Sequence, residues 1–155
     1  KVPQPRSRVY SRRGCVRRGT HAARSAEGGM VKGQARKRLG KRAKKGFRGF
    51  PLATIAFYGP DGGRATKLVV GIILEGDQEP ADLRRWFARG ADIRADPGPA
   101  EEVLAFIDRF GVRSVAMVDR VIGCPHEEGI DYEGPTCPHC PYWAGRDRWT
   151  GEIIQ

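Results

Sequence analysis

The sequence has little of what several protein classes require. It contains no apolar run near the roughly 18 residues that a membrane helix needs, and its longest such run, residues 68–74, includes Gly71. Only four of its 155 residues are cysteine, three of them clustered, so it lacks the evenly spaced framework of a disulfide-stapled secreted domain. We therefore expect a soluble protein of a reducing compartment, the cytoplasm.

Acidic residues are almost absent from the first third of the chain. Residues 1–50 carry 17 Lys and Arg against one acid, Glu27, whereas residues 51–155 carry 11 Lys and Arg against 17 Asp and Glu. The formal net charge of +10 thus belongs to the N-terminal segment, and the remainder of the chain is acidic. The chain is long enough for one ordinary hydrophobic core, but not for two substantial domains.

Residues 1–29 also lack large apolar residues and any hydrophobic periodicity. Such a segment cannot offset the conformational entropy lost on folding, so we expect it to be disordered. The chain begins with Lys1, and Met30 opens a more ordinary basic protein start. We interpret residues 1–29 as upstream sequence or an added extension, in which Cys15 and His21 have no function.

Residues 30–50 form a basic segment interrupted by four glycines. Glycine at that density predicts a flexible tail. Multiple Lys and Arg side chains bind nucleic acid by releasing its condensed counterions, so we predict that this tail associates with nucleic acid, with RNA ahead of DNA. The predicted contacts are Lys32, Arg36, Lys37, Arg38, Lys41, Arg42, Lys44, Lys45 and Arg48.

Residues 51–122 have the strand and helix signals of a small α/β body. The glycines of GPDGG, residues 59–63, suit a tight turn between two strands, although a phosphate-binding loop is an alternative. The expected fold class is α/β: a β-β-α-α-β layer with a C-terminal Cys/His metal loop and a disordered basic N-terminal tail. The expected elements are strands at 52–58 and 65–74, helices at 80–90 and 97–110, and a strand at 112–118.

Residues 123–155 contain the sequence CPHEEGIDYEGPTCPHC, which holds five candidate metal ligands in seventeen residues. Cys137 and Cys140 have the C-x-x-C spacing with which one turn directs two thiolates at one ion, and Cys124 with His126 completes a tetrahedral Cys₃His zinc set. His139 is the alternative fourth ligand. We favour His126, because His139 lies between the two knuckle cysteines and should point away from their ion.

The same loop resembles parts of two enzyme motifs. His126 to Glu128 followed by PTCPHC resembles the H-x-E…P-C-x-x-C motif of zinc deaminases, which would make Glu128 a proton shuttle, but the gap is too short for the helix and strand of that family. CPHEEG and CPHCPYW resemble the two loops of a Rieske [2Fe–2S] protein, although Cys140 stands where that pattern needs histidine. An iron–sulfur cluster is therefore the alternative cofactor, with Cys124, His126, Cys137 and either His139 or Cys140 as ligands.

Residues 46–155 are also similar, as a whole, to an uncharacterised family of small bacterial proteins. The matching residues are Gly123–Gly129, Cys137–Trp143 and Arg146–Trp149, in the pattern GCPHEEG…CPxCP(F/Y)W…RDRW. The resemblance implies a basic lead-in, an α/β body and a zinc-knuckle-like module in a bacterial cytosolic setting. It implies no known activity.

The function that these patterns favour is a small, non-catalytic zinc protein whose basic tail associates with nucleic acid. The metal loop contains four carboxylates, which would repel phosphate, so the tail and not the loop should contact nucleic acid. Trp143 and Trp149 are expected to cover the metal loop or to pack on the sheet, and base stacking is the alternative. Two other functions stay open: a metalloenzyme or redox protein, and a structural zinc adaptor whose acidic surface binds a basic protein.

Overall fold

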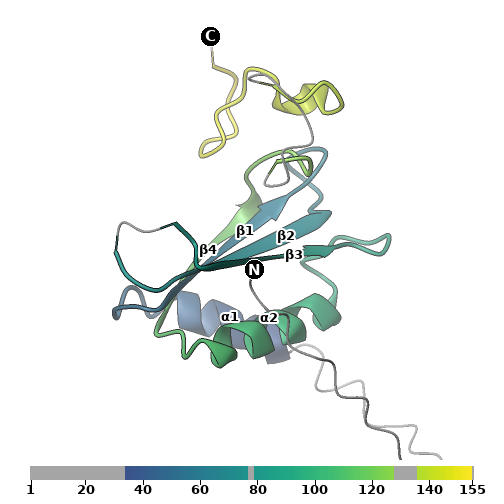
Figure 1. Cartoon of the computed structure of the whole chain (residues 1–155). Helices are drawn as coiled ribbons and strands as arrows, with labels where there is room; N and C mark the ends of the chain where they lie inside the picture. The colour runs from purple at the N-terminus through teal and green to yellow at the C-terminus, as the bar shows by residue number, and fades with distance from the viewer. Residues whose placement is uncertain (1–33, 77–78, 128–135, 155) are drawn as a thin grey trace, which may run out of the picture.

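The computed structural model describes residues 34–76, 79–127 and 136–154. A four-stranded sheet carries two helices on one face, and the C-terminal residues lie at one end of the sheet (Figure 1). The predicted α/β class is therefore confirmed. The elements are α1 (Gln34–Ala43), β1 (Leu52–Tyr58), β2 (Lys67–Ile73), β3 (Asp82–Phe87), α2 (Pro97–Arg109), β4 (Ser114–Val121) and η1 (Pro141–Trp143).

The strand order is β3-β2-β1-β4, with antiparallel pairing of β1 with β2 and of β2 with β3, and parallel pairing of β1 with β4. The GPDGG stretch forms the predicted turn, in which the Asp61 carboxylate accepts hydrogen bonds from the backbone of Gly63 and Arg64 at 2.8 and 3.0 Å. A Cβ atom on Gly59 would lie 1.8 Å from the carbonyl oxygen of Arg64, so glycine is required there.

Helix α2 lies in the crossover connection between β3 and β4, which the parallel pairing of β4 with β1 requires. The Asp96 side chain caps its N-terminus by accepting a hydrogen bond from the backbone N–H of Gly98 at 3.0 Å. The chain then leaves the helix through Gly111, whose φ of +60° favours glycine. The buried face of α2 packs on the sheet through Val103, Phe106 and Ile107.

The prediction of a helix at residues 80–90 is wrong, because residues 82–87 form the edge strand β3. Leu83, Trp86 and Phe87 have helical spacing, but the segment is short and β2 offers its backbone groups as partners. Its side chains follow the two-residue period of a strand. Trp86 packs in the core below the sheet, and Leu83 packs in a second cluster on the opposite face.

The prediction of a flexible tail is wrong for residues 34–43, which form helix α1. Ala35 and Leu39 are 4% and 5% exposed and belong to the hydrophobic core, and Ala43 packs against it. The three lie four residues apart, which places them on one helix face. Burial of this apolar face outweighs the helix-weakening effect of Gly40.

Several predictions concern residues outside the described ranges. They include the disorder of residues 1–29, the phosphate contact by Lys32 and the proton-shuttle alternative for Glu128. Within the described ranges, none of the helices has the length and apolar character needed to cross a membrane.

Candidate metal centre

Three cysteines and one histidine lie together beyond the end of β4. We call Cys124, His126, Cys137 and Cys140 the metal group; their ligand atoms all lie within 4.8 Å of one another. The Nδ1 atom of His126 is 3.4 Å from the Sγ atom of each cysteine. A tetrahedral ion with Zn–S bonds of about 2.3 Å and a Zn–N bond of about 2.0 Å would separate these atoms by roughly 3.5 Å. The spacing therefore fits one shared ion and is compatible with zinc.

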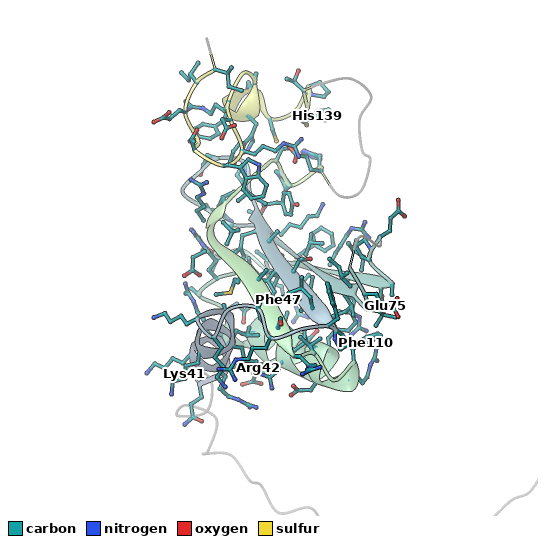
Figure 2. The ribbon with its side chains drawn as sticks, turned by 90° about the vertical axis from the view of Figure 1, so that its left-hand side faces the viewer. Lys41, Arg42, Phe47, Glu75, Phe110 and His139 are labelled. Atoms are coloured by element: carbon teal, nitrogen blue, oxygen red, sulfur yellow. The ribbon has the colours of Figure 1, made fainter. Side chains whose placement is uncertain are left out.

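The alternative ligand, His139, lies outside the metal group. Its side chain is exposed, and its ring centroid is 5.4 Å from that of His126. Figure 2 shows it at the periphery of the C-terminal residues, away from the sheet. The structure thus brings together the favoured set of four residues and leaves out the alternative.

The three thiols of the metal group are buried and free of disulfide bonds. Burial raises the pKa of the Cys124 thiol to about 12, and burial also raises the pKa of Cys140. A cluster of thiols in this environment ionises only if a cation compensates the negative charge. The backbone N–H of His126 donates a hydrogen bond to Cys124 Sγ at 3.3 Å, which also stabilises a thiolate there.

A buried lysine from β2 holds the loop that carries Cys124 and His126, the first two residues of the metal group. Lys67 is 2% exposed, and its Nζ atom donates hydrogen bonds to the carbonyl oxygens of Pro125, at 2.9 Å, and Glu127. These carbonyls flank His126, so Lys67 sets the position of the loop that carries this ring. Lys67 was not among the predicted site residues, although a lysine within the apolar run ATKLVV is a signal of a buried, partnered cation.

The carboxylate of Glu127 connects the two halves of the site. Its Oε1 atom accepts a hydrogen bond from the backbone N–H of Cys124 at 3.3 Å. Its Oε2 atom is buried and has no hydrogen bond of good geometry, but the Arg148 guanidinium lies 2.9 Å away and compensates its charge. Glu127 therefore holds the loop after β4 against residues near the C-terminus.

Trp143 anchors the second half of the metal group to the sheet. It is the last residue of η1, which begins directly after Cys140, and it is 9% exposed. Its Nε1 atom donates a hydrogen bond to the carbonyl oxygen of Gly59 at 2.8 Å. Tyr142 is 38% exposed, and the Arg146 guanidinium lies 4.3 Å from its ring centroid. Trp143 therefore covers the site as predicted, whereas Trp149 is 62% exposed and lies beside the sheet, the other predicted position.

The chemistry of the metal group is that of a closed site. Three thiolates and one imidazole fill a tetrahedral coordination sphere, which leaves no position for a substrate. Ligand atoms that all lie within 4.8 Å of one another suit one ion better than a two-iron cluster, whose ligand pairs are separated by the width of the cluster. The arrangement can therefore hold a structural ion.

The predicted nucleic-acid contacts that fall in the described ranges lie on α1 and just after it. Arg42 is half-buried and pairs with Asp108 of α2 at 2.7 Å (Figure 2 labels Lys41 and Arg42). The other seven side chains are exposed: Arg36, Lys37, Arg38, Lys41, Lys44, Lys45 and Arg48.

Comparison with known proteins gives this chain no relative. No family model, curated protein or solved structure matches it. The similarity to small bacterial proteins with a GCPHEEG…CPxCP(F/Y)W pattern therefore stays a prediction. The metal group is what the structure itself establishes about function: three buried thiols and a half-buried histidine that could hold a metal ion.

Proposed function

We propose that this chain is a non-catalytic zinc protein that associates with nucleic acid through the basic residues of α1 and of the segment that follows it. One observation carries the metal part: four ligand atoms lie within 4.8 Å of one another, and three of them belong to buried thiols. A site of three thiolates also suits a reducing compartment, so we place the protein in the cytoplasm.

The nucleic-acid part is supported by the charge of residues 34–50. This segment contains eight Lys and Arg and no acid. Seven of the eight side chains are exposed, and α1 is held to the body by its apolar face and by Arg42. A helix fixed in this way presents its charges on a surface that phosphate groups can contact. RNA is favoured over DNA, as in the sequence analysis.

Metal content tests the first part. Protein purified under reducing conditions should be colourless and contain one zinc per chain. Cys140→Ser should lose the metal, whereas His139→Ala should retain it, because His139 lies outside the metal group. A coloured protein that contains iron would contradict the zinc assignment and favour the [2Fe–2S] alternative.

Salt dependence of binding tests the second part. A labelled twelve-nucleotide oligouridine, U12, should bind more weakly to the Lys37→Gln/Lys41→Gln variant, and the slope of log affinity against log salt should fall by about 1.4, or about 0.7 per lost contact. Arg89→Gln, an exposed residue beyond β3, is the control and should leave the slope unchanged. An unchanged slope in the double variant would refute nucleic-acid association through α1.

A further inference from the structure

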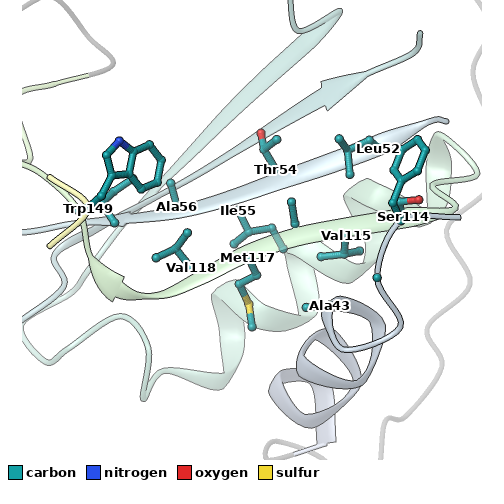
Figure 3. Close-up of a pocket in the computed structure, with 14 residues that line it drawn as sticks. Ala43, Leu52, Thr54, Ile55, Ala56, Ser114, Val115, Met117, Val118 and Trp149 are labelled. Carbon is teal, nitrogen blue, oxygen red and sulfur yellow. The ribbon is translucent and has the colours of Figure 1, made fainter. Parts of the chain in front are cut away.

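An apolar groove of about 610 Å³ lies mostly on the sheet face opposite the helices and reaches Ala43, at the end of α1 (Figure 3). It runs over β1 and β4, with Leu52 and Ser114 towards one end, Ala56 and Val118 along it, and Trp149 at the other end. The helices cover only the other face of the sheet (Figure 1). The groove is therefore open, and its volume is that of an ordinary ligand site.

Two exposed aromatic side chains line this groove. Phe47, from the segment after α1, is 66% exposed, and Trp149 is 62% exposed. Both are held in position: Phe47 makes an edge-to-face contact with Phe50 at 5.2 Å, and the turn that carries Trp149 is closed by its backbone N–H, which donates to Asp147 at 2.8 Å. Each therefore offers an exposed aromatic surface on which a planar group could stack.

The groove has a positive end and no acidic lining residue. Three exposed cations, Lys44, Lys45 and Arg48, flank Phe47 in the sequence. The backbone N–H of Arg48 donates a hydrogen bond to Ser114 Oγ at 2.7 Å, which fixes this basic segment at the start of β4. An occupant that carries negative charge along one side and flat apolar groups along the other would complement this surface.

We propose that the groove binds single-stranded nucleic acid, whose bases stack on Phe47 and Trp149 while its phosphates contact Lys44, Lys45 and Arg48 in the segment after α1. Stacking on aromatic side chains tolerates any base, and sheet faces with exposed aromatics bind single strands in this manner. The small side chains of Ala56 and Ala116 leave space for unstacked bases. The inference rests on the proposed function and adds a binding surface for the bases of the nucleic acid.

Fluorescence anisotropy with U12 tests this inference on the full chain. Phe47→Ala and Trp149→Ala should each weaken binding about 5- to 100-fold without changing the salt slope, because they remove stacking and not phosphate contacts. Phe87→Ala is the matched control: Phe87 is 65% exposed but lies on β3, outside the groove. Circular dichroism and zinc content should show each variant to be folded.

A second pair of measurements separates stacking from loss of structure. Trp149→Phe should restore most of the affinity, because it keeps an aromatic surface. U12 should quench the fluorescence of the wild-type protein, and this quenching should disappear in Trp149→Phe, since Trp86 and Trp143 are buried. An abasic twelve-mer keeps the phosphates but has no bases to stack. It should therefore bind wild type and Trp149→Ala with the same low affinity. A deoxythymidine twelve-mer, dT12, compares a DNA strand with the RNA strand U12. Stacking predicts that Trp149→Ala lowers the affinity for both strands by the same factor.

The outcomes distinguish this inference from the proposed function. Wild-type affinity for U12 in both alanine variants, or equal affinity of wild type for U12 and the abasic strand, would overturn the groove site and leave the α1 contacts standing. Two results together support both the proposed function and the groove site. Binding should be weakened in the Lys37→Gln/Lys41→Gln variant, and Trp149→Ala should bind more weakly with an unchanged salt slope. A dimer in sedimentation that dissociates on Trp149→Ala and is unaffected by U12 would assign the groove to a second copy of the chain and overturn the inference.

Discussion

At the residue scale, Lys67 is a buried cation beside a cluster of thiols. It is 2% exposed, and its ammonium group binds the backbone carbonyls of Pro125 and Glu127, on either side of His126. A divalent ion bound by three thiolates and a neutral imidazole leaves the site with one net negative charge. Lys67 therefore orients the loop, and it would compensate the charge of a loaded site.

Replacement of this lysine should weaken metal binding without removing a ligand. Lys67→Met keeps the aliphatic stem and should lower zinc affinity about 10- to 100-fold, as measured by competition with a chromophoric chelator. Lys41→Met, on the exposed face of α1, is the control and should bind zinc like wild type. Wild-type affinity in Lys67→Met would show that the loop holds its geometry without the lysine.

Asp92 is a second residue whose charge contributes to the fold. Its carboxylate accepts hydrogen bonds from the Arg94 guanidinium at 2.6 Å and from the backbone N–H of Ala65 at 3.2 Å. The side-chain hydrogen bond from Arg94, together with these backbone donors, lowers the pKa of Asp92 from 3.8 to about 2. Because the folded pKa lies below the unfolded value, ionised Asp92 stabilises the fold above about pH 4, and this stabilisation is lost as the pH falls towards 2.

Asp92→Asn should therefore be destabilised in a pH-dependent manner. At pH 7 we expect the variant to lose about 1–2 kcal/mol in the free energy of unfolding relative to wild type, after allowance for partial exposure of the pair. The difference should shrink as the pH falls from 4 to 2. Urea titrations of both proteins at each pH measure it. Asp108→Asn, which breaks a surface pair with Arg42, should cost less than about 1 kcal/mol. A gap that stays constant with pH would contradict the assignment.

At the scale of elements, local spacing misled the sequence analysis where tertiary partners decide the structure. Residues 82–87 pair with β2. The Arg84 guanidinium lies 5.3 Å from the centroid of the Phe106 ring, so Arg84 is on the same sheet face as Trp86, two residues later, as the period of a strand requires. Residues 34–43 form a helix because Ala35 and Leu39 find a surface on α2 and β4. In both cases the partner lies far away in the sequence, so the local sequence of the segment does not reveal it.

Helix α1 should depend on one side chain. Leu39→Ala should destabilise the protein by about 2–3 kcal/mol and reduce the helical signal, because it removes the largest buried group of α1. Lys37→Ala, exposed on the same helix, should change stability by less than about 0.5 kcal/mol. Both are measured by urea unfolding followed by circular dichroism. Equal stability of the two variants would mean that α1 does not depend on its contact with the body.

At the scale of the whole molecule, the metal group joins the sheet to the C-terminal residues. Contacts to the sheet come from both sides of the group: Lys67 of β2 holds the loop after β4, and Trp143 bonds to Gly59 at the end of β1. Glu127 and Arg148 close the site from the C-terminal side. Binding of a metal ion at this group would therefore be coupled to the attachment of residues 136–154.

Removal of the metal should release these residues while the sheet and helices remain. Treatment with a strong chelator under reducing conditions should shift the fluorescence of Trp143 to longer wavelength and make residues 136–154 accessible to protease, with little change in helical circular dichroism. Re-addition of zinc should reverse both changes. Loss of the whole fold on chelation would show that the ion stabilises the sheet as well.

The sequence by itself determined what depends on local chemistry. Ligand type and spacing predicted the Cys₃His set, and turn and cap residues predicted the β1–β2 hairpin and α2, because these need only near neighbours. Tertiary structure alone decided what depends on distant partners: β3 as a strand, α1 as a docked helix, Lys67 in the metal loop, and the groove between Phe47 and Trp149. The physical reason is that packing surfaces and hydrogen-bond partners distant in sequence are created only when the chain folds.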